Sequence, residues 1–171
     1  GSSPDEANAL VLQPDGKLVA AGFANSASNG SNEDFAVLRY NGDGSLDTSF
    51  GFGGRVLTAV GSGNDRATAV LLQPDGKLVA AGYSTGSNND FAVVRYNSDG
   101  SLDTTFGTGG KVTTAIGSSH DYGYAVTLQP DGKFVVAGYA RVGTDDDFAV
   151  VRYNGDGSLD VTFDGDGKAT T

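Results

Sequence analysis

A short segment that occurs three times constrains the fold of this chain more than any other feature. It reads Leu-Gln-Pro-Asp-Gly-Lys-Leu-Val at residues 12–19, recurs unchanged at 72–79, and returns at 128–135 with Phe134 in place of leucine. In such a turn, proline presets φ, aspartate caps the turn through its side chain, and glycine takes the left-handed conformation. Because apolar runs flank the turn on both sides, each copy predicts a β-hairpin.

Aligning these turns divides the chain into three repeat units, which we expect to form three blades: residues 1–60, 61–116 and 117–171. Each unit opens with Gly-Ser and closes with a run rich in valine and threonine, and no linker separates the units. Within a unit the pattern predicts four strands. In the second unit these are residues 67–73, 77–83, 91–96 and 111–116.

The first three predicted strands are apolar on both alternating faces, which is typical of a sheet covered on both sides. The fourth is more amphipathic and suits a sheet edge. A four-stranded antiparallel meander repeated about every 56 to 60 residues is typical of a β-propeller blade, whereas a β-solenoid has a shorter period and a sandwich exposes one face of each sheet. The acidic residues agree, because all except Glu6 and Glu33 are aspartate, which favours turns over helices. We therefore predict an all-β, propeller-type array of three four-stranded blades.

Three blades are too few to close a propeller ring as a single chain. Three solutions remain open: further repeats of a longer chain, two copies that form one ring, or head-to-tail stacking into a filament. In all three cases, the first expected partner of this chain is a further repeat or another copy of the chain.

The repeated motifs resemble those of the delta-60 repeat family. They are Leu-Gln-Pro-Asp-Gly-Lys at 72–77, Asp-Phe-Ala-Val-Val-Arg-Tyr-Asn at 90–97 and Asp-Gly-Ser-Leu-Asp-Thr-Thr-Phe-Gly at 99–107. The resemblance covers essentially the whole chain and implies a β-propeller-like repeat of secreted or surface-attached bacterial proteins. The third unit departs from the motif at 163–167, where Phe-Asp-Gly-Asp-Gly replaces Phe-Gly-x-Gly-Gly, so the geometry of its last turn is open.

The composition argues against several classes of binding partner. A net charge of −10 and a pI near 4.2 disfavour nucleic acid and anionic membranes. No apolar run has the length of a membrane span, so membrane insertion is not expected. The sequence has no cysteine, which removes disulfide and zinc-thiolate chemistry and is compatible with an oxidising exterior. We expect an extracellular or cell-surface location, with any targeting segment outside this sequence.

The turn after each third strand is the strongest candidate metal site. Calcium loops place oxygen ligands at fixed positions around a glycine, and this turn matches several of them. The candidate ligands are Asn41, Asp43, Asp47, Asn97, Asp99, Asp103, Asn154, Asp156 and Asp160. However, Arg39 occupies the first position, where calcium needs a carboxylate. The alternative is that Arg39 donates to Asp43 or Asp47 and holds the turn without metal, as in the Asp-boxes of other propellers.

Several other side chains could serve either packing or binding. We expect the aromatic and leucine residues of the long turn to fill the gap between blades, although an aromatic there could also stack on a sugar. These residues are Phe50, Phe106, Phe163, Leu46, Leu102 and Leu159. The acids Asp34, Asp90 and Asp147 recur in register, which favours a structural role over a glycosidase pair. His120, the single histidine, is expected in solvent, and Asn29-Gly30-Ser31 fits a glycosylation acceptor.

These observations favour a non-enzymatic extracellular scaffold or adhesion module whose variable loops, between the second and third strands, bind glycan or protein. No cofactor is expected beyond the calcium alternative. The competing hypotheses are a subunit of a self-assembling filament and a propeller hydrolase acting on polysaccharide. The hydrolase would need acids unique to one blade and aimed at a common centre, whereas most acids here recur.

Overall fold

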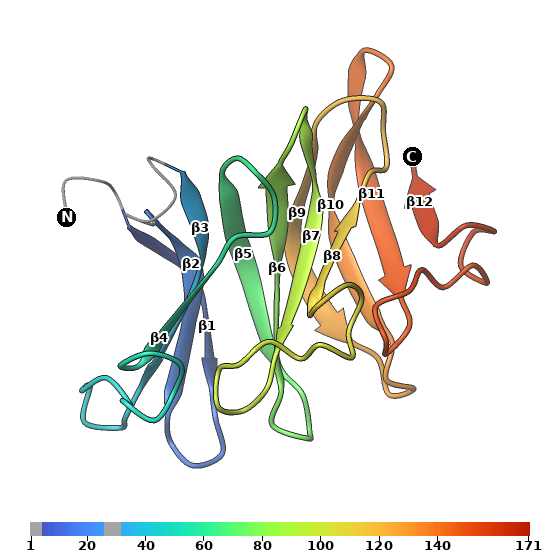
Figure 1. Cartoon of the computed structure of the whole chain (residues 1–171). Helices are drawn as coiled ribbons and strands as arrows, with labels where there is room; N and C mark the ends of the chain where they lie inside the picture. The colour runs from blue at the N-terminus through green and yellow to red at the C-terminus, as the bar shows by residue number, and fades with distance from the viewer. Residues whose placement is uncertain (1–4, 26–31) are drawn as a thin grey trace.

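The structure is a computed structural model that describes residues 5–25 and 32–171, which form three four-stranded sheets (Figure 1). Blade 1 contains β1 (Glu6–Leu12), β2 (Leu18–Asn25), β3 (Glu33–Tyr40) and β4 (Arg55–Thr58). Blade 2 contains β5 (Asp65–Leu72), β6 (Leu78–Thr85), β7 (Asn89–Tyr96) and β8 (Lys111–Thr114). Blade 3 contains β9 (Asp121–Leu128), β10 (Phe134–Val142), β11 (Asp145–Tyr153) and β12 (Lys168–Thr170). The described residues include no helix long and apolar enough to cross a membrane.

Each sheet is an antiparallel meander in chain order, and none closes into a barrel. The predicted all-β array of four-stranded blades is therefore confirmed. The fourth strand of every blade lies at a sheet edge, as its amphipathic pattern predicts. The strand predicted at 111–116 ends two residues earlier, at Thr114, because the carboxylate of Asp121 accepts a hydrogen bond from the backbone N–H of Ile116 at 2.7 Å.

The repeated hairpin turn has the predicted geometry. In blade 1 the N–H of Gly16 donates to the carbonyl of Gln13 at 2.9 Å, and Gly16 has a φ of 83°. A carboxylate oxygen of Asp15 accepts from the N–H of Lys17 at 3.1 Å, so aspartate caps the turn. The turns at Gly76 and Gly132 repeat this arrangement, each with a φ of 84°.

The apolar core lies between blades. One cluster of buried residues joins blade 1 to blade 2 and includes Val19, Val37, Leu78 and Val94. A second cluster joins blade 2 to blade 3 and includes Val79, Val93, Phe134 and Val151. The central sheet is thus covered on both faces, which explains its almost continuous apolar strands.

The first strands of the three blades lie side by side, with β1 against β5 and β5 against β9. A β-bulge interrupts β1 between Ala7 and Ala9 and β5 at the equivalent place. The second strand has a glycine opposite this irregularity. A Cβ on Gly22 would lie 1.8 Å from the carbonyl oxygen of Glu6, so only glycine allows this approach. The first strands therefore meet along one inner edge of the array.

Candidate functional site

The most regular polar cluster of the molecule joins two turns within each blade. In blade 1, Oδ2 of Asp47 accepts from Nε of Arg39 at 2.7 Å and from Nζ of Lys17 at 2.9 Å. Its other oxygen accepts from the backbone N–H and the hydroxyl of Ser49, at 3.1 and 2.7 Å. Asp47 is only 6% exposed. The equivalent clusters are Arg95–Asp103–Lys77 and Arg152–Asp160–Lys133.

These contacts include the ion pair between Arg39 and Asp47 that the alternative to calcium requires. The cations are an arginine and a lysine of the chain itself, and both carboxylate oxygens have donors. Asp43 takes no part, because its oxygen accepts instead from the N–H and hydroxyl of Ser45 at 3.0 and 2.6 Å. The amide of Asn41 also donates to that hydroxyl, at 3.0 Å. The predicted ligands of one turn thus belong to two separate hydrogen-bonded groups, and the described residues contain no cluster of three acidic or histidine side chains able to hold a metal.

The calcium alternative is tested by chelation. We expect the thermal midpoint of the chain to stay unchanged in excess EDTA, because Arg39 and Lys17 already neutralise Asp47. Differential scanning fluorimetry with and without chelator measures this directly. A drop in the midpoint that added Ca²⁺ reverses would instead assign calcium to these turns.

The same cluster predicts that stability depends on pH. Hydrogen bonds from Lys17 and Ser49 hold the pKa of Asp47 well below its usual range, and those from Thr162 and Lys133 do the same for Asp160. A carboxyl whose pKa is lowered on folding stabilises the protein above its unfolded pKa of about 3.9 and loses this contribution as pH falls. We expect the urea midpoint to fall steadily from pH 5 toward pH 2. An unchanged midpoint over this range would contradict the prediction.

A second site lies at the inner edge, where the three first strands meet. A cavity of about 370 Å³ opens there, within the size range of small-molecule pockets. Its lining combines aromatic rings with a carboxylate, a guanidinium, an amide and a hydroxyl. The lining residues are Glu6, Asn8, Phe23, Arg66, Thr68, Tyr83, Tyr122 and Tyr124. We call this the axial cavity. It contains side chains of all three blades.

A continuous row of rings and one cation runs along the axial cavity. The guanidinium of Arg66 lies 4.4 Å from the ring centre of Phe23. Tyr83 meets Tyr122 edge to face at 4.7 Å, and Tyr122 continues to Tyr139 at 5.1 Å. The row thereby links blade 1 to blade 3 across the inner edge.

An ion pair holds one end of this row. Nε of Arg66 donates to Oε2 of Glu33, which is only 9% exposed and belongs to blade 1. At the other end, burial and the neighbouring Tyr124 raise the pKa of Tyr139 to about 12, so its hydroxyl keeps its proton. Tyr124 remains 50% exposed and presents its ring to solvent. The site therefore offers an exposed aromatic surface beside fixed hydrogen-bonding groups.

These axial residues are absent from the sequence-based predictions, although the sequence contained a signal for them. The first strand differs between the blades most clearly at two positions near its start, which hold Glu6, Arg66 and Tyr122, and Asn8, Thr68 and Tyr124. In register, Glu6 pairs with Phe23, Arg66 with Tyr83, and Tyr122 with Tyr139. The second residue of each pair lies two or three residues before the end of the second strand, close to the variable loop that the sequence favours for binding.

The predicted packing residues behave according to their blade. Phe50 and Phe106 are fully buried between blades, whereas Phe163 is half-buried because no described blade follows it. Leu102 and Leu159 pack against the two cores. Leu46 is 38% exposed, since no described blade precedes it.

The remaining candidates have structural contacts or stay predictions. His120 is exposed, as predicted, and its Nδ1 accepts from the N–H of Asn89 at 3.2 Å. Asp34 is buried, Asp90 and Asp147 are partly buried, and burial raises the pKa of Asp90. The three lie at the second or third position of the third strands, one in each blade. The glycosylation acceptor at Asn29-Gly30-Ser31 lies outside the described residues.

The three antiparallel sheets, packed face to face with their first strands together, define the chain as a β-propeller repeat protein. It belongs to the family described as a β-propeller domain of unknown function, DUF5122, whose model matches residues 13–50, 73–106 and 129–163, one segment in each blade. Together these segments cover more than half of the chain, which confirms the resemblance to delta-60-like repeats. No curated protein matches the sequence.

Proposed function

We propose that this chain is a non-enzymatic module of the extracellular space or cell surface, with a scaffold or adhesion role, that binds a glycan at the axial cavity and the adjoining variable loops. The observation that carries the proposal is the position of the residues that break the repeat. In a structure whose turns repeat in all three blades, first-strand residues that differ between the blades lie together in one cavity.

The chemistry of the axial cavity supports a sugar more than an apolar ligand. The half-exposed ring of Tyr124 can cover the C–H face of a pyranose. Glu6, Arg66 and Asn8 lie around it and can hydrogen-bond to hydroxyl groups. The absence of cysteine and the low pI are compatible with an exterior location.

The hydrolase alternative requires two carboxyl groups facing each other across the substrate. Glu6 is the single carboxylate among the described lining residues of the axial cavity, and Arg66 engages nearby Glu33. This composition favours binding over hydrolysis. The filament hypothesis is supported by a different observation, the uncovered apolar faces of the outer blades.

The proposal is tested with a glycan array, followed by titration of the best ligand. We expect Tyr124→Ala and Tyr122→Ala to weaken binding at least tenfold, because each removes a ring from the cavity. Phe52→Ala is the matched control: Phe52 is 85% exposed in the turn at the opposite end of blade 1. Turnover in a hydrolase panel, or saturable binding to a protein with no glycan bound, would overturn the proposal.

A further inference from the structure

The two outer blades each have one sheet face that no described segment covers. We call the face that blades 2 and 3 turn toward the preceding blade the front face, and the opposite face the back face. One back-face position shows the difference: Phe35 and Phe91 are 0% exposed, whereas their counterpart Phe148 on blade 3 is 80% exposed. The back face of blade 3 thus exposes the residue type that blades 1 and 2 bury.

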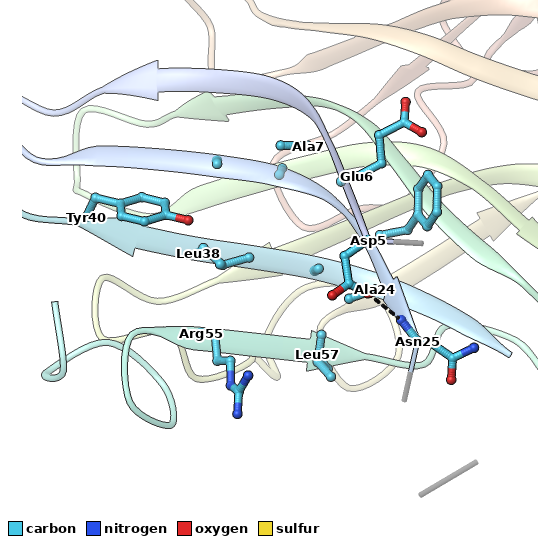
Figure 2. A pocket seen from close by; sticks show the side chains of 14 residues that line it. Asp5, Glu6, Ala7, Ala24, Asn25, Leu38, Tyr40, Arg55 and Leu57 are labelled. Carbon is cyan, nitrogen blue, oxygen red and sulfur yellow. Dashed lines mark hydrogen bonds between the residues drawn. The ribbon is translucent and has the colours of Figure 1, made fainter. Parts of the chain in front are cut away.

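The uncovered front face of blade 1 is hollowed. A cavity of about 300 Å³ lies over the sheet, with Leu38, Tyr40, Arg55 and Leu57 around it (Figure 2). The positions equivalent to Leu38 and Tyr40 are fully buried in blades 2 and 3, against the preceding blade. They are Val94, Tyr96, Val151 and Tyr153.

Hydrogen bonds across the internal interfaces show what this face is built to contact. A front-face tyrosine hydroxyl donates to a back-face threonine hydroxyl in both interfaces. The pairs are Tyr96 to Thr58 at 2.9 Å and Tyr153 to Thr114 at 2.8 Å. The equivalent tyrosine of blade 1 is Tyr40, on the front face. The equivalent threonine of blade 3 is Thr171, next to β12. The two outer faces thus hold the matching halves of one further hydrogen bond.

A second contact repeats in the same way. Nη1 of Arg39 donates to the carbonyl of Ser98, and Nη1 of Arg95 donates to that of Gly155. The remaining halves are Arg152 on blade 3 and the carbonyl of Gly42 on blade 1. Each outer face therefore carries one partner of this polar contact in addition to its apolar residues.

Backbone packing agrees with these half-contacts. Gly100 and Gly157 are buried where the preceding blade comes close. A Cβ on Gly100 would lie 2.8 Å from the backbone nitrogen of Gly51. Their counterpart Gly44 has the same left-handed φ, is exposed, and has open space around it. The space beside Gly44 is therefore where another blade would lie.

We propose that a second copy of this chain docks the back face of its blade 3 on the front face of blade 1, in the geometry of the two internal interfaces. The contact is heterologous, since it joins two different surfaces. Such contacts either close a ring of two copies or continue as an open series. The proposal does not depend on the axial cavity and goes beyond the proposed glycan binding.

The test measures mass by light scattering over a concentration series, using substitutions at exposed positions that do not disturb the internal cores. Leu12→Lys alters the front face of blade 1, where Leu12 is 64% exposed, and Phe148→Lys alters the back face of blade 3. The unmodified chain is expected to associate. Each variant alone is expected to associate at least tenfold more weakly, because every contact needs one intact face of each kind.

Mixing the two variants is the decisive arm. The mixture is expected to recover a one-to-one complex, because the Leu12→Lys copy keeps its back face and the Phe148→Lys copy keeps its front face. The control is Val161→Lys, at a position exposed in all three blades, which should associate like the unmodified chain. An unmodified chain that stays monomeric at its highest soluble concentration would overturn the proposal. So would association of the unmodified chain without recovery in the mixture.

Discussion

Replacing Asp103 with alanine is expected to lower the free energy of unfolding by about 3 kcal/mol or more, as when one partner of a buried ion pair is removed. Asp103 accepts from Nε of Arg95 at 2.7 Å and from Nζ of Lys77 at 2.9 Å, and its side chain is only 6% exposed. Because the Arg95 side chain is only 8% exposed, the substitution leaves a nearly buried guanidinium without its carboxylate partner. Urea unfolding followed by circular dichroism measures the change.

The matched control is Asp99→Ala in the same turn. Asp99 is exposed, and its carboxylate accepts from the N–H and hydroxyl of Ser101, at 2.9 and 2.6 Å. Its removal is expected to change stability much less than the removal of Asp103, because the Asp99 carboxylate is exposed. If both variants lose the same stability, the ion cluster is not what holds the turn. If Asp103→Ala shows a large loss that calcium depletion of the unmodified chain reproduces, the turn depends on metal.

Much of this fold was predictable because its signals are local. The hairpin at residues 12–19 carries its own turn chemistry, and the nearly continuous apolar runs show which strands are covered on both faces. The repeat then extends one local interpretation to all three blades. The strand ends were less predictable. β8 ends at Thr114, and the carboxylate that binds the backbone just after it belongs to Asp121, at the start of the next strand.

The site was harder to predict, since its contacts join distant parts of the chain. The role of Lys17 in the first turn becomes clear only beside Asp47, thirty residues later in the sequence. The axial cavity needs still more, because Arg66 contacts Phe23 and Tyr122 contacts Tyr83 only when neighbouring blades are packed. Repetition reveals the blades, and departures from repetition mark the cavity, but only the packing shows that these departures meet.

The last turn of blade 3, where residues 163–167 depart from the repeated motif, shares one left-handed position with the turns of blades 1 and 2. Asp164 has a φ of 48°, close to the 54° of Gly51 and the 51° of Gly107. A Cβ on Gly107 would lie 2.4 Å from both Cγ2 of Val112 and the backbone oxygen of Lys111, and Gly51 has the equivalent contacts, so blades 1 and 2 require glycine there. In blade 3 the position of that valine is Ala169, which removes the contact with the methyl group. The rest of the turn differs from the other two: φ is positive at Gly165 (88°) but not at its counterparts Phe52 and Thr108, and Asp166 lacks the positive φ of Gly53 and Gly109.

The second large effect is expected at the aromatic residue between blades. Phe106→Ala is expected to destabilise the chain by about 3–5 kcal/mol, as for other buried aromatic residues. The ring is fully buried, meets Phe134 edge to face at 6.0 Å, and lies under the guanidinium of Arg95 at 4.6 Å. Truncation would leave a cavity at the junction of blades 2 and 3 and remove a contact that holds Arg95 in place.

The repeat supplies the control for this substitution. Phe163 holds the same position in blade 3, where its ring also lies under an arginine, Arg152, at 4.7 Å, but is only half-buried. At low protein concentration, where copies are separate, Phe163→Ala should lose less than half as much stability as Phe106→Ala. Equal losses would mean that the ring stabilises its own turn and not the contact between blades. A loss at Phe163 that grows with protein concentration would instead show that a second copy covers this ring.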